Sequence, residues 1–142
     1  MKRLLLLLGP VALLLAGCAS YDAQVVPGKS LQGLHQFFVL SNLNDNHAID
    51  RQITAALQQR GFEADSGPRT MLPDKAQAII TYQDRWTWDF GDHLVYLTID
   101  VRDALSNEPI AAITYNASVP LREPVAATVN RLVGQLVTGR KS

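Results

Sequence analysis

The sequence predicts an α+β fold, a two-layer sandwich in which two helices cover one face of a mostly antiparallel sheet of four to five strands. Between Ala78 and Arg102, apolar and polar residues alternate with a period of two on either side of Gly91, which is typical of a hairpin. Residues 49–60 and 125–136 instead carry apolar side chains at helical spacing. Read along the chain, the elements follow the order β-α-β-β-β-β-α.

The first core strand is Gln36–Leu40, which is apolar on both faces and is therefore expected in the interior of the sheet. A turn rich in Asn and Asp, residues 41–46, is suited to capping the helix that follows. That helix extends to Arg60, and Gly61 is expected to end it. Its apolar face would consist of Ile49, Ile53, Ala56 and Leu57. A short strand over 62–64 and a loop over 65–74 come next.

The long hairpin has a predicted register. A two-residue turn at Phe90 and Gly91 aligns the apolar faces of the two strands. The expected pairs are Trp88 with His93, Trp86 with Val95, Tyr82 with Ile99, and Ile80 with Val101.

A turn at 104–108 leads to the last strand, and a C-terminal helix follows it. The inner face of the strand would hold Ala111, Ile113, Tyr115, Ala117 and Val119. Pro124 suits the first turn of a helix, where its missing N–H costs nothing. The helix is expected to end at Gly139, with an apolar stripe of Val125, Val129, Leu132, Val133 and Leu136.

The N-terminus has the pattern of a secretory signal: two cations, an apolar run over 4–16, and small residues before Cys18. The apolar run is shorter than the ~20 residues that span a bilayer, and Gly9-Pro10 interrupts it. The final residues, Leu15-Ala16-Gly17-Cys18, resemble the lipobox of bacterial lipoproteins. That resemblance implies cleavage before Cys18, lipidation of its thiol and acylation of its new N-terminus. Two or more acyl chains anchor a protein stably.

The predicted organisation is a signal peptide over 1–17, a lipidated cysteine and tether over 18–33, and a periplasmic domain over 34–142. Fully extended, the fifteen residues from Ala19 would reach at most ~50 Å. Ala19 stands where an aspartate would favour retention in the inner membrane, so the outer membrane is expected. Across the whole chain, the lipobox, the Phe-rich strand, the helix ending at Arg60-Gly61-Phe62, the hairpin and the final helix resemble small Gram-negative lipoproteins of uncharacterised families.

Composition excludes several classes of function. The mature chain of 125 residues would carry 11 basic and 13 acidic side chains, a formal charge of −2, so no nucleic-acid partner is expected. Cys18 is the only cysteine, and the anchor would consume it, so neither a disulfide nor a cysteine-ligated metal is available. No phosphate-binding glycine loop or catalytic motif is present, and no cofactor is predicted.

Three groups of polar residues could carry chemistry. Asp89, Asp92 and His93 at the hairpin turn could hold a divalent cation, but aspartates are common in turns and no metal spacing supports the site, so no metal is predicted. Asp84 lies on the aromatic face opposite Leu97, either as a perturbed acid in a pocket or at a bulge or wet sheet end. A hydrolase would need paired carboxylates such as Asp84 and Asp100, which the register directs to opposite faces.

Aromatic residues gather at the end of the hairpin: Trp86, Trp88, Phe90 and Tyr96. Such a stripe is usually core, yet a strand from Tyr82 to Phe90 spans ~30 Å. A fifteen-residue helix covers only ~22 Å of it. Exposed aromatics of this kind form binding hot spots. The sequence therefore favours a non-enzymatic binding or accessory module, with the membrane held through the lipid anchor and an envelope protein, peptidoglycan or a lipid as partner. The alternative is a cell-wall or lipid hydrolase.

Overall fold

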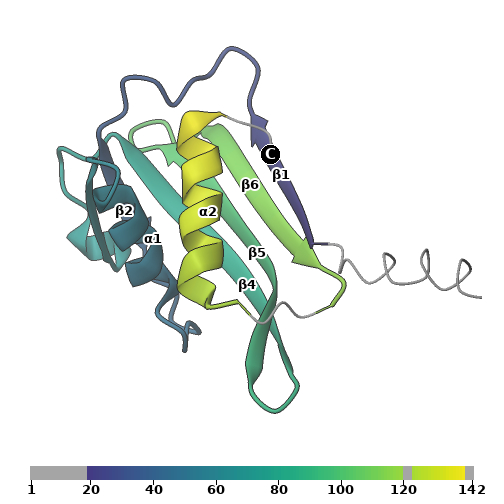
Figure 1. Cartoon of the computed structure of the whole chain (residues 1–142). Helices are drawn as coiled ribbons and strands as arrows, with labels where there is room; N and C mark the ends of the chain where they lie inside the picture. Colours follow the sequence, from purple (N-terminus) through teal and green to yellow (C-terminus); the bar gives the residue numbers. More distant parts are fainter. Residues whose placement is uncertain (1–18, 120–122, 140–142) are drawn as a thin grey trace, which may run out of the picture.

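The computed structural model describes residues 19–119 and 123–139, and it forms one sheet with two helices on one face (Figure 1). The strand order in the sheet is β1-β6-β5-β4-β2-β3. The strands are β1 (Ala19–Val25), β2 (Gln36–Leu40), β3 (Glu63–Gly67), β4 (Ala78–Trp88), β5 (Asp92–Asp103) and β6 (Pro109–Ala117). The helices are α1 (Ile49–Gln58) and α2 (Val125–Thr138), and a short 3-10 helix, η2, spans Arg69–Met71. Among the described residues, no helix is long and apolar enough to cross a membrane.

The α+β sandwich is confirmed, but the prediction of a mostly antiparallel sheet of four to five strands is wrong. The sheet has six strands and is mixed. β1, β6, β5 and β4 pair antiparallel, whereas β2 pairs parallel with both β3 and β4. β2 and β3 run parallel because α1 carries the chain from the end of β2 back to the start of β3, and the connection that includes η2 likewise returns it from the end of β3 to the start of β4.

The sixth strand comes from the segment expected to be a tether. Residues 19–25 form β1, which pairs with β6 from Ala19 opposite Ala117 to Val25 opposite Ala111. The sequence does alternate there: Ala19, Tyr21 and Ala23 are packed against the core, and polar residues lie between them. Only residues 26–35 connect this strand to β2.

The core lies between the sheet and the two helices, as the apolar patterns predict. The α1 face of Ile49, Ile53, Ala56 and Leu57 is buried, and so are Val129, Leu132, Val133 and Leu136 of α2. Ala111, Ile113, Tyr115 and Ala117 of β6 face them, whereas Val119 is exposed. Gly61 and Gly139 end the helices with left-handed backbone, at φ 86° and 63°.

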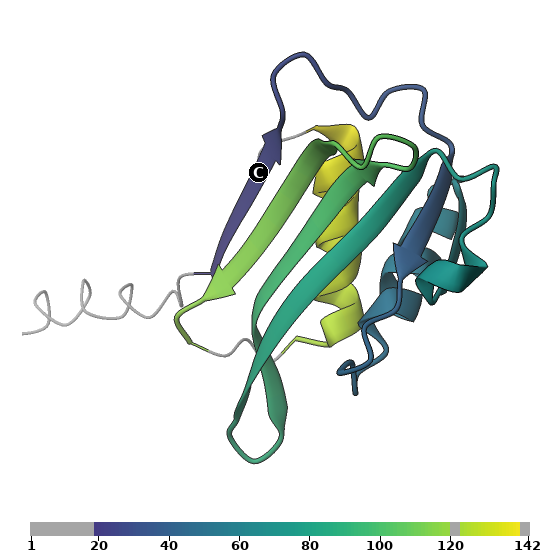
Figure 2. The ribbon, with the colours of Figure 1, turned by 180° about the vertical axis from the view of Figure 1, so that it is seen from behind.

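A second, smaller apolar contact covers part of the opposite face of the sheet. Phe38 and Ile79 are buried there, although they do not belong to the main core. The 68–76 loop, which includes η2, lies over them, and an atom added to Gly67 would sit 3.5 Å from both Phe38 and Met71. The prediction that Gln36–Leu40 is an interior strand is confirmed, because β2 lies between β4 and β3. Within residues 19–119 and 123–139, no helix covers the rest of this face, over β4, β5, β6 and β1 (Figure 2).

Candidate functional site

The hairpin of β4 and β5 extends past the helices and ends in a projecting tip, residues 88–92 (Figures 1 and 2). Its loop has three residues, Asp89 to Gly91, because Trp88 pairs with Asp92. The pairs predicted for Trp88 with His93 and for Trp86 with Val95 are therefore wrong. Deeper in the hairpin, the predicted pairs of Tyr82 with Ile99 and Ile80 with Val101 are confirmed.

A β-bulge explains how both results hold in one hairpin. Between Arg85 and Trp86 the register shifts, so Arg85 pairs with Tyr96 while Trp86 pairs with Leu94. Val95 is the extra residue on β5. The three-residue loop displaces the register by one residue, and the bulge restores it. Leu94, at 6% exposure, thereby turns into the core, and Trp86 shares its face.

Two aromatic side chains at the tip remain in solvent. Trp88 is 72% exposed and Phe90 is 95% exposed, and their ring centroids lie 6.0 Å apart. Phe90 also has left-handed backbone, with φ 51°. For a bulky residue this conformation costs about 1 kcal/mol, which the exposed ring does not recover by packing within the domain. Neither side chain is there to fill the core, so the tip is the strongest candidate contact surface among the described residues.

The other two residues of the predicted contact surface have partners inside the domain. Trp86 is half-buried, and the His47 ring stacks on it with centroids 3.6 Å apart and planes inclined by 13°. The indole N–H of Trp86 donates to the Asp84 carboxylate. Tyr96 lies on the face of the sheet away from the helices, and the Arg85 guanidinium sits 4.3 Å from its ring centroid. The structure thus separates Trp88 and Phe90 from Trp86 and Tyr96.

Asp45, in the loop before α1, collects hydrogen bonds that fasten this loop to β4. Its carboxylate accepts the N–H groups of His47 at 2.8 Å and Ile49 at 2.6 Å, and the Tyr82 hydroxyl at 2.7 Å. A weaker bond comes from the Asp50 N–H at 3.4 Å. Partial burial would raise the pKa of Asp45, but the bonds from Tyr82 and the backbone outweigh it and hold that pKa below its usual range. Burial, followed by the bond to Asp45, strongly raises the pKa of Tyr82.

One group of described residues has metal-like spacing: ligand atoms of Asp45, His47 and Asp84 lie within 4.8 Å of one another. Both Asp45 oxygens already accept hydrogen bonds, and one Asp84 oxygen accepts the Trp86 N–H. These bonds account for the carboxylates without an ion. His47 was not expected here: its Nε2 lies 3.2 Å from an Asp92 oxygen, and no sequence spacing links a loop residue to a strand 45 positions away.

The predicted turn group does not converge. His93 Nε2 lies 2.9 Å from the Asp89 carbonyl oxygen, whereas the Asp92 carboxylate lies near His47 instead. Asp84 keeps its predicted place opposite Leu97 and is half-buried on the helix side, and the register shift at the bulge follows between Arg85 and Trp86. Asp100 pairs with Thr81 on the other face, and burial raises its pKa against the opposing charge of Arg102. The two carboxylates therefore do not share a cleft.

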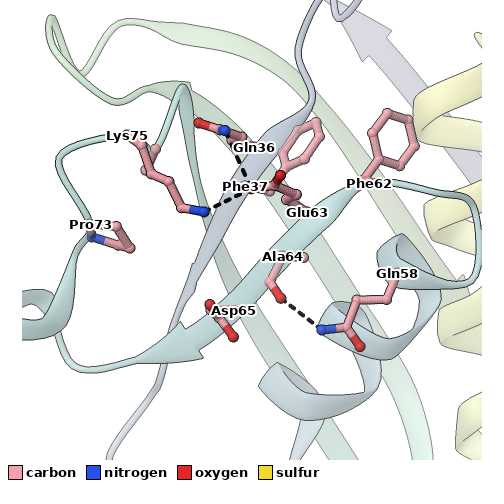
Figure 3. A pocket seen from close by; sticks show the side chains of 10 residues that line it. Gln36, Phe37, Gln58, Phe62, Glu63, Ala64, Asp65, Pro73 and Lys75 are labelled. Atoms are coloured by element: carbon pink, nitrogen blue, oxygen red, sulfur yellow. Dashed lines mark hydrogen bonds and ion pairs between the residues drawn. The ribbon is translucent and has the colours of Figure 1, made fainter.

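A pocket of about 300 Å³ lies at the β3 edge of the sheet, between α1 and the loop before β4 (Figure 3). Its lining residues are Gln36, Phe37, Gln58, Phe62, Glu63, Ala64, Asp65, Pro73, Lys75 and Ala76. Lys75 Nζ donates to Glu63 at 2.8 Å, and this bond and its charge hold the pKa of Glu63 below its usual range. The lining contains no histidine, serine, threonine or cysteine, and its charged side chains, Glu63, Asp65 and Lys75, leave it with a net negative charge. The pocket therefore lacks a hydroxyl or thiol nucleophile paired with a histidine base.

A wider hollow of about 500 Å³ lies beside the tip, between it and the start of α2. It is lined by Asp89, Phe90, Asp92, His93, Glu123, Pro124 and Val125. The Glu123 carboxylate accepts the Thr128 hydroxyl at 2.6 Å and Arg131 at 3.0 Å. These bonds, with the Thr128 bond the largest effect, hold the pKa of Glu123 below its usual range. Three carboxylates, the rings of Phe90 and His93, and the apolar Pro124 and Val125 thus surround the hollow.

Comparisons with known proteins identify the fold. No family model matches the chain, and no curated protein sequence matches it. A structure of the PelC dodecamer from Paraburkholderia phytofirmans aligns with a TM-score of 0.60 at 12% identity, covering 85% of this chain and 96% of that one. A PDZ domain protein from Parabacteroides distasonis aligns with a TM-score of 0.52 at 10% identity, covering 84% of this chain but 35% of that one.

A minor lipoprotein from Acinetobacter baumannii aligns over 75% of this chain at 9% identity, with a TM-score of 0.41. That score is too low to carry an argument. At these identities the PelC and PDZ-protein alignments show a shared fold alone. The arrangement of one mixed sheet with two helices is therefore found in other bacterial proteins, and the function of this chain has to be argued from its own residues.

Proposed function

We propose that the protein is a lipoprotein of the cell envelope, anchored in the outer membrane through Cys18 with its domain in the periplasm. It acts there as a binding or accessory module and not as an enzyme. The lipobox ending at Cys18 supports the anchor, although that residue lies outside the described part of the structure. The observation that carries the binding role is the exposure of Trp88 and Phe90 at a tip that projects beyond the core.

Physical reasoning supports a contact role for the tip. Exposed aromatic side chains supply large apolar areas that become favourable once a partner removes them from water. Trp88 and Phe90 are neighbours, so one partner covers both. The opposite faces taken by Asp84 and Asp100 favour binding over hydrolysis, because paired-carboxylate chemistry needs both groups at one reacting bond.

Photo-crosslinking in living cells tests this function. A photoreactive residue replaces Trp88 at the tip, and a control probe replaces Gln59, which is exposed at the C-terminal end of α1. A discrete adduct with an envelope protein, a glycan or a lipid at position 88 but not at position 59 is the expected result. Absence of any adduct at position 88, or equal labelling at both positions, would overturn the binding role of the tip.

Self-assembly is a second candidate function, supported by the likeness to PelC, whose structure is a dodecamer. The sheet of this chain ends in two edge strands, β1 and β3, whose outer sides pair with no other described strand. Such edges are able to pair with a second chain. Native mass spectrometry of the mature protein in detergent would reveal an oligomer, and a monomer at every concentration would remove this candidate.

A further inference from the structure

The position of β1 relates the anchor to the tip. β1 begins at Ala19, the residue directly after Cys18, and Ala19 pairs with Ala117 at the end of β6. One residue earlier in β6, Asn116 pairs with both Ser20 and Tyr96. The chain therefore leaves the sheet toward Cys18 at the level of Tyr96, on the same end of the sheet as the hairpin tip.

The tip reaches beyond that level. Tyr96 and Asp92 are four positions apart in β5, which amounts to ~13 Å at the rise of a strand. Sideways, β6 alone lies between β1 and β5, so the two strands are ~10 Å apart. Figure 2 shows the hairpin passing the ends of β6 and β1 on this side. A lipid group on Cys18 thus places the bilayer at the end of the domain from which the tip projects.

Exposed apolar side chains are concentrated at this end. Seven large hydrophobic side chains are exposed among the described residues, and four of them lie here: Leu43, Trp88, Phe90 and Val119. Leu43 belongs to this end because β2 runs parallel to β4 and its following loop emerges beside the hairpin. Val119 follows β6, two residues after the Ala117 that pairs with Ala19. These exposed apolar side chains therefore gather at the end of the domain where the chain leaves the sheet toward Cys18.

We propose that the tip inserts Trp88 and Phe90 into the interfacial layer of the same bilayer that holds Cys18. This inference rests on the proposed lipoprotein function and names the partner of the tip as the lipid surface. Tryptophan is enriched at that layer because its ring is apolar and its N–H is polar. Asp89 and Asp92 oppose attraction to anionic headgroups, so insertion depends on the apolar rings and suits a leaflet rich in zwitterionic lipid. Anchor and tip together hold the domain in one orientation.

Fluorescence quenching in vesicles tests this contact. The full mature lipoprotein is reconstituted into phosphatidylethanolamine–phosphatidylcholine vesicles whose acyl chains carry bromine, which quenches nearby tryptophans. The chain has two tryptophans, Trp86 and Trp88. Emission of the wild type is expected to shift to the blue and lose intensity. Trp88→Phe, which alters only an exposed ring, should show no such loss from the remaining Trp86.

A matched control adds Gln59→Trp to the Trp88→Phe chain, which places an exposed tryptophan near the C-terminal end of α1. That tryptophan should stay unquenched. A chain that floats with the vesicles but whose Trp88 is no more quenched than the tryptophan at position 59 would overturn this inference alone. A wild-type chain that does not float with the vesicles would overturn the lipoprotein proposal and this inference with it. Vesicle insertion of Trp88, with lipid adducts at position 88 and protein adducts only at position 59, would support the lipid contact and place any protein partner away from the tip.

Discussion

Replacing Asp45 with alanine should destabilise the domain more than any other single change in the loop before α1. The carboxylate accepts the backbone N–H groups of His47 in the loop and of Ile49 at the start of α1, although Ala48 is the N-cap residue, and the loss of comparable side-chain bonds at a helix start costs about 1 kcal/mol. It also accepts the Tyr82 hydroxyl, which is 2.7 Å away. A hydrogen bond to a charged group contributes about 1.5–3 kcal/mol, and the buried hydroxyl would lose its acceptor. Together these contributions give a decrease of about 3 kcal/mol in the free energy of unfolding.

Urea denaturation of the mature lipoprotein in detergent, followed by far-UV circular dichroism, measures this loss. In thermal unfolding it corresponds to a fall in Tm of about 10 °C for a domain of this size. The matched control is Asp74→Ala, at an exposed loop position for which the described structure shows no hydrogen bond. A loss below about 1 kcal/mol, or one equal to the control, would refute the assignment of Asp45 as the fastening point between loop and strand.

The contribution of Asp45 to the free energy of unfolding depends on pH because its pKa is lowered in the folded state. Because the folded pKa lies below the unfolded value of 3.8, the folded state stays ionised where the unfolded chain binds a proton. The contribution of Asp45 is therefore complete above about pH 5. It is lost as the pH falls below 3.8 through the folded pKa. Asp45→Asn should remove this dependence, so the stabilities of the two proteins should converge at low pH.

Three further outcomes are expected from the cluster at the base of the hairpin. His47→Ala removes the ring stacked on Trp86 and should cost about 1 kcal/mol in urea denaturation, whereas an unchanged midpoint would mean that the stack contributes nothing. Asp84→Asn keeps an oxygen that accepts the Trp86 N–H, so the free energy of unfolding should change by less than about 1 kcal/mol. Calorimetric titration with zinc or calcium chloride should give no heat of binding, and a saturable heat abolished by His47→Ala would contradict this.

Much of the fold could be predicted because its apolar patterns are local. The buried faces of α1, α2 and β6 follow from spacing alone, and Gly61 and Gly139 take the left-handed conformations expected at helix ends. The mixed sheet could not be predicted in this way. β2 pairs with both β3 and β4, but the five residues of β3, EADSG, carry no apolar alternation that would show where this strand lies in the sheet.

The hairpin shows why part of the candidate site was missed. A three-residue loop and a bulge each shift the register by one residue, and together they cancel below Arg85. From Arg85 back to Ala78, a hairpin with the three-residue loop and the bulge therefore has the same side-chain alternation as a hairpin with a two-residue turn and no bulge. Only the residues between them differ, and these include Trp86 and Trp88. His47 escaped prediction for a different reason, since its contacts with Trp86 and Asp92 are purely tertiary.

The strand that replaces the expected tether changes what the proposed anchor can do. A fifteen-residue tether would let the domain move up to ~50 Å from the membrane and turn freely. β1 instead begins one residue after Cys18 and is held by pairing with β6 along its whole length. To leave the membrane, the domain would have to break those strand hydrogen bonds or pull the acyl chains from the bilayer. If Cys18 is lipidated as proposed, it keeps this end of the sheet at the lipid surface, and any partner of the domain has to reach it there.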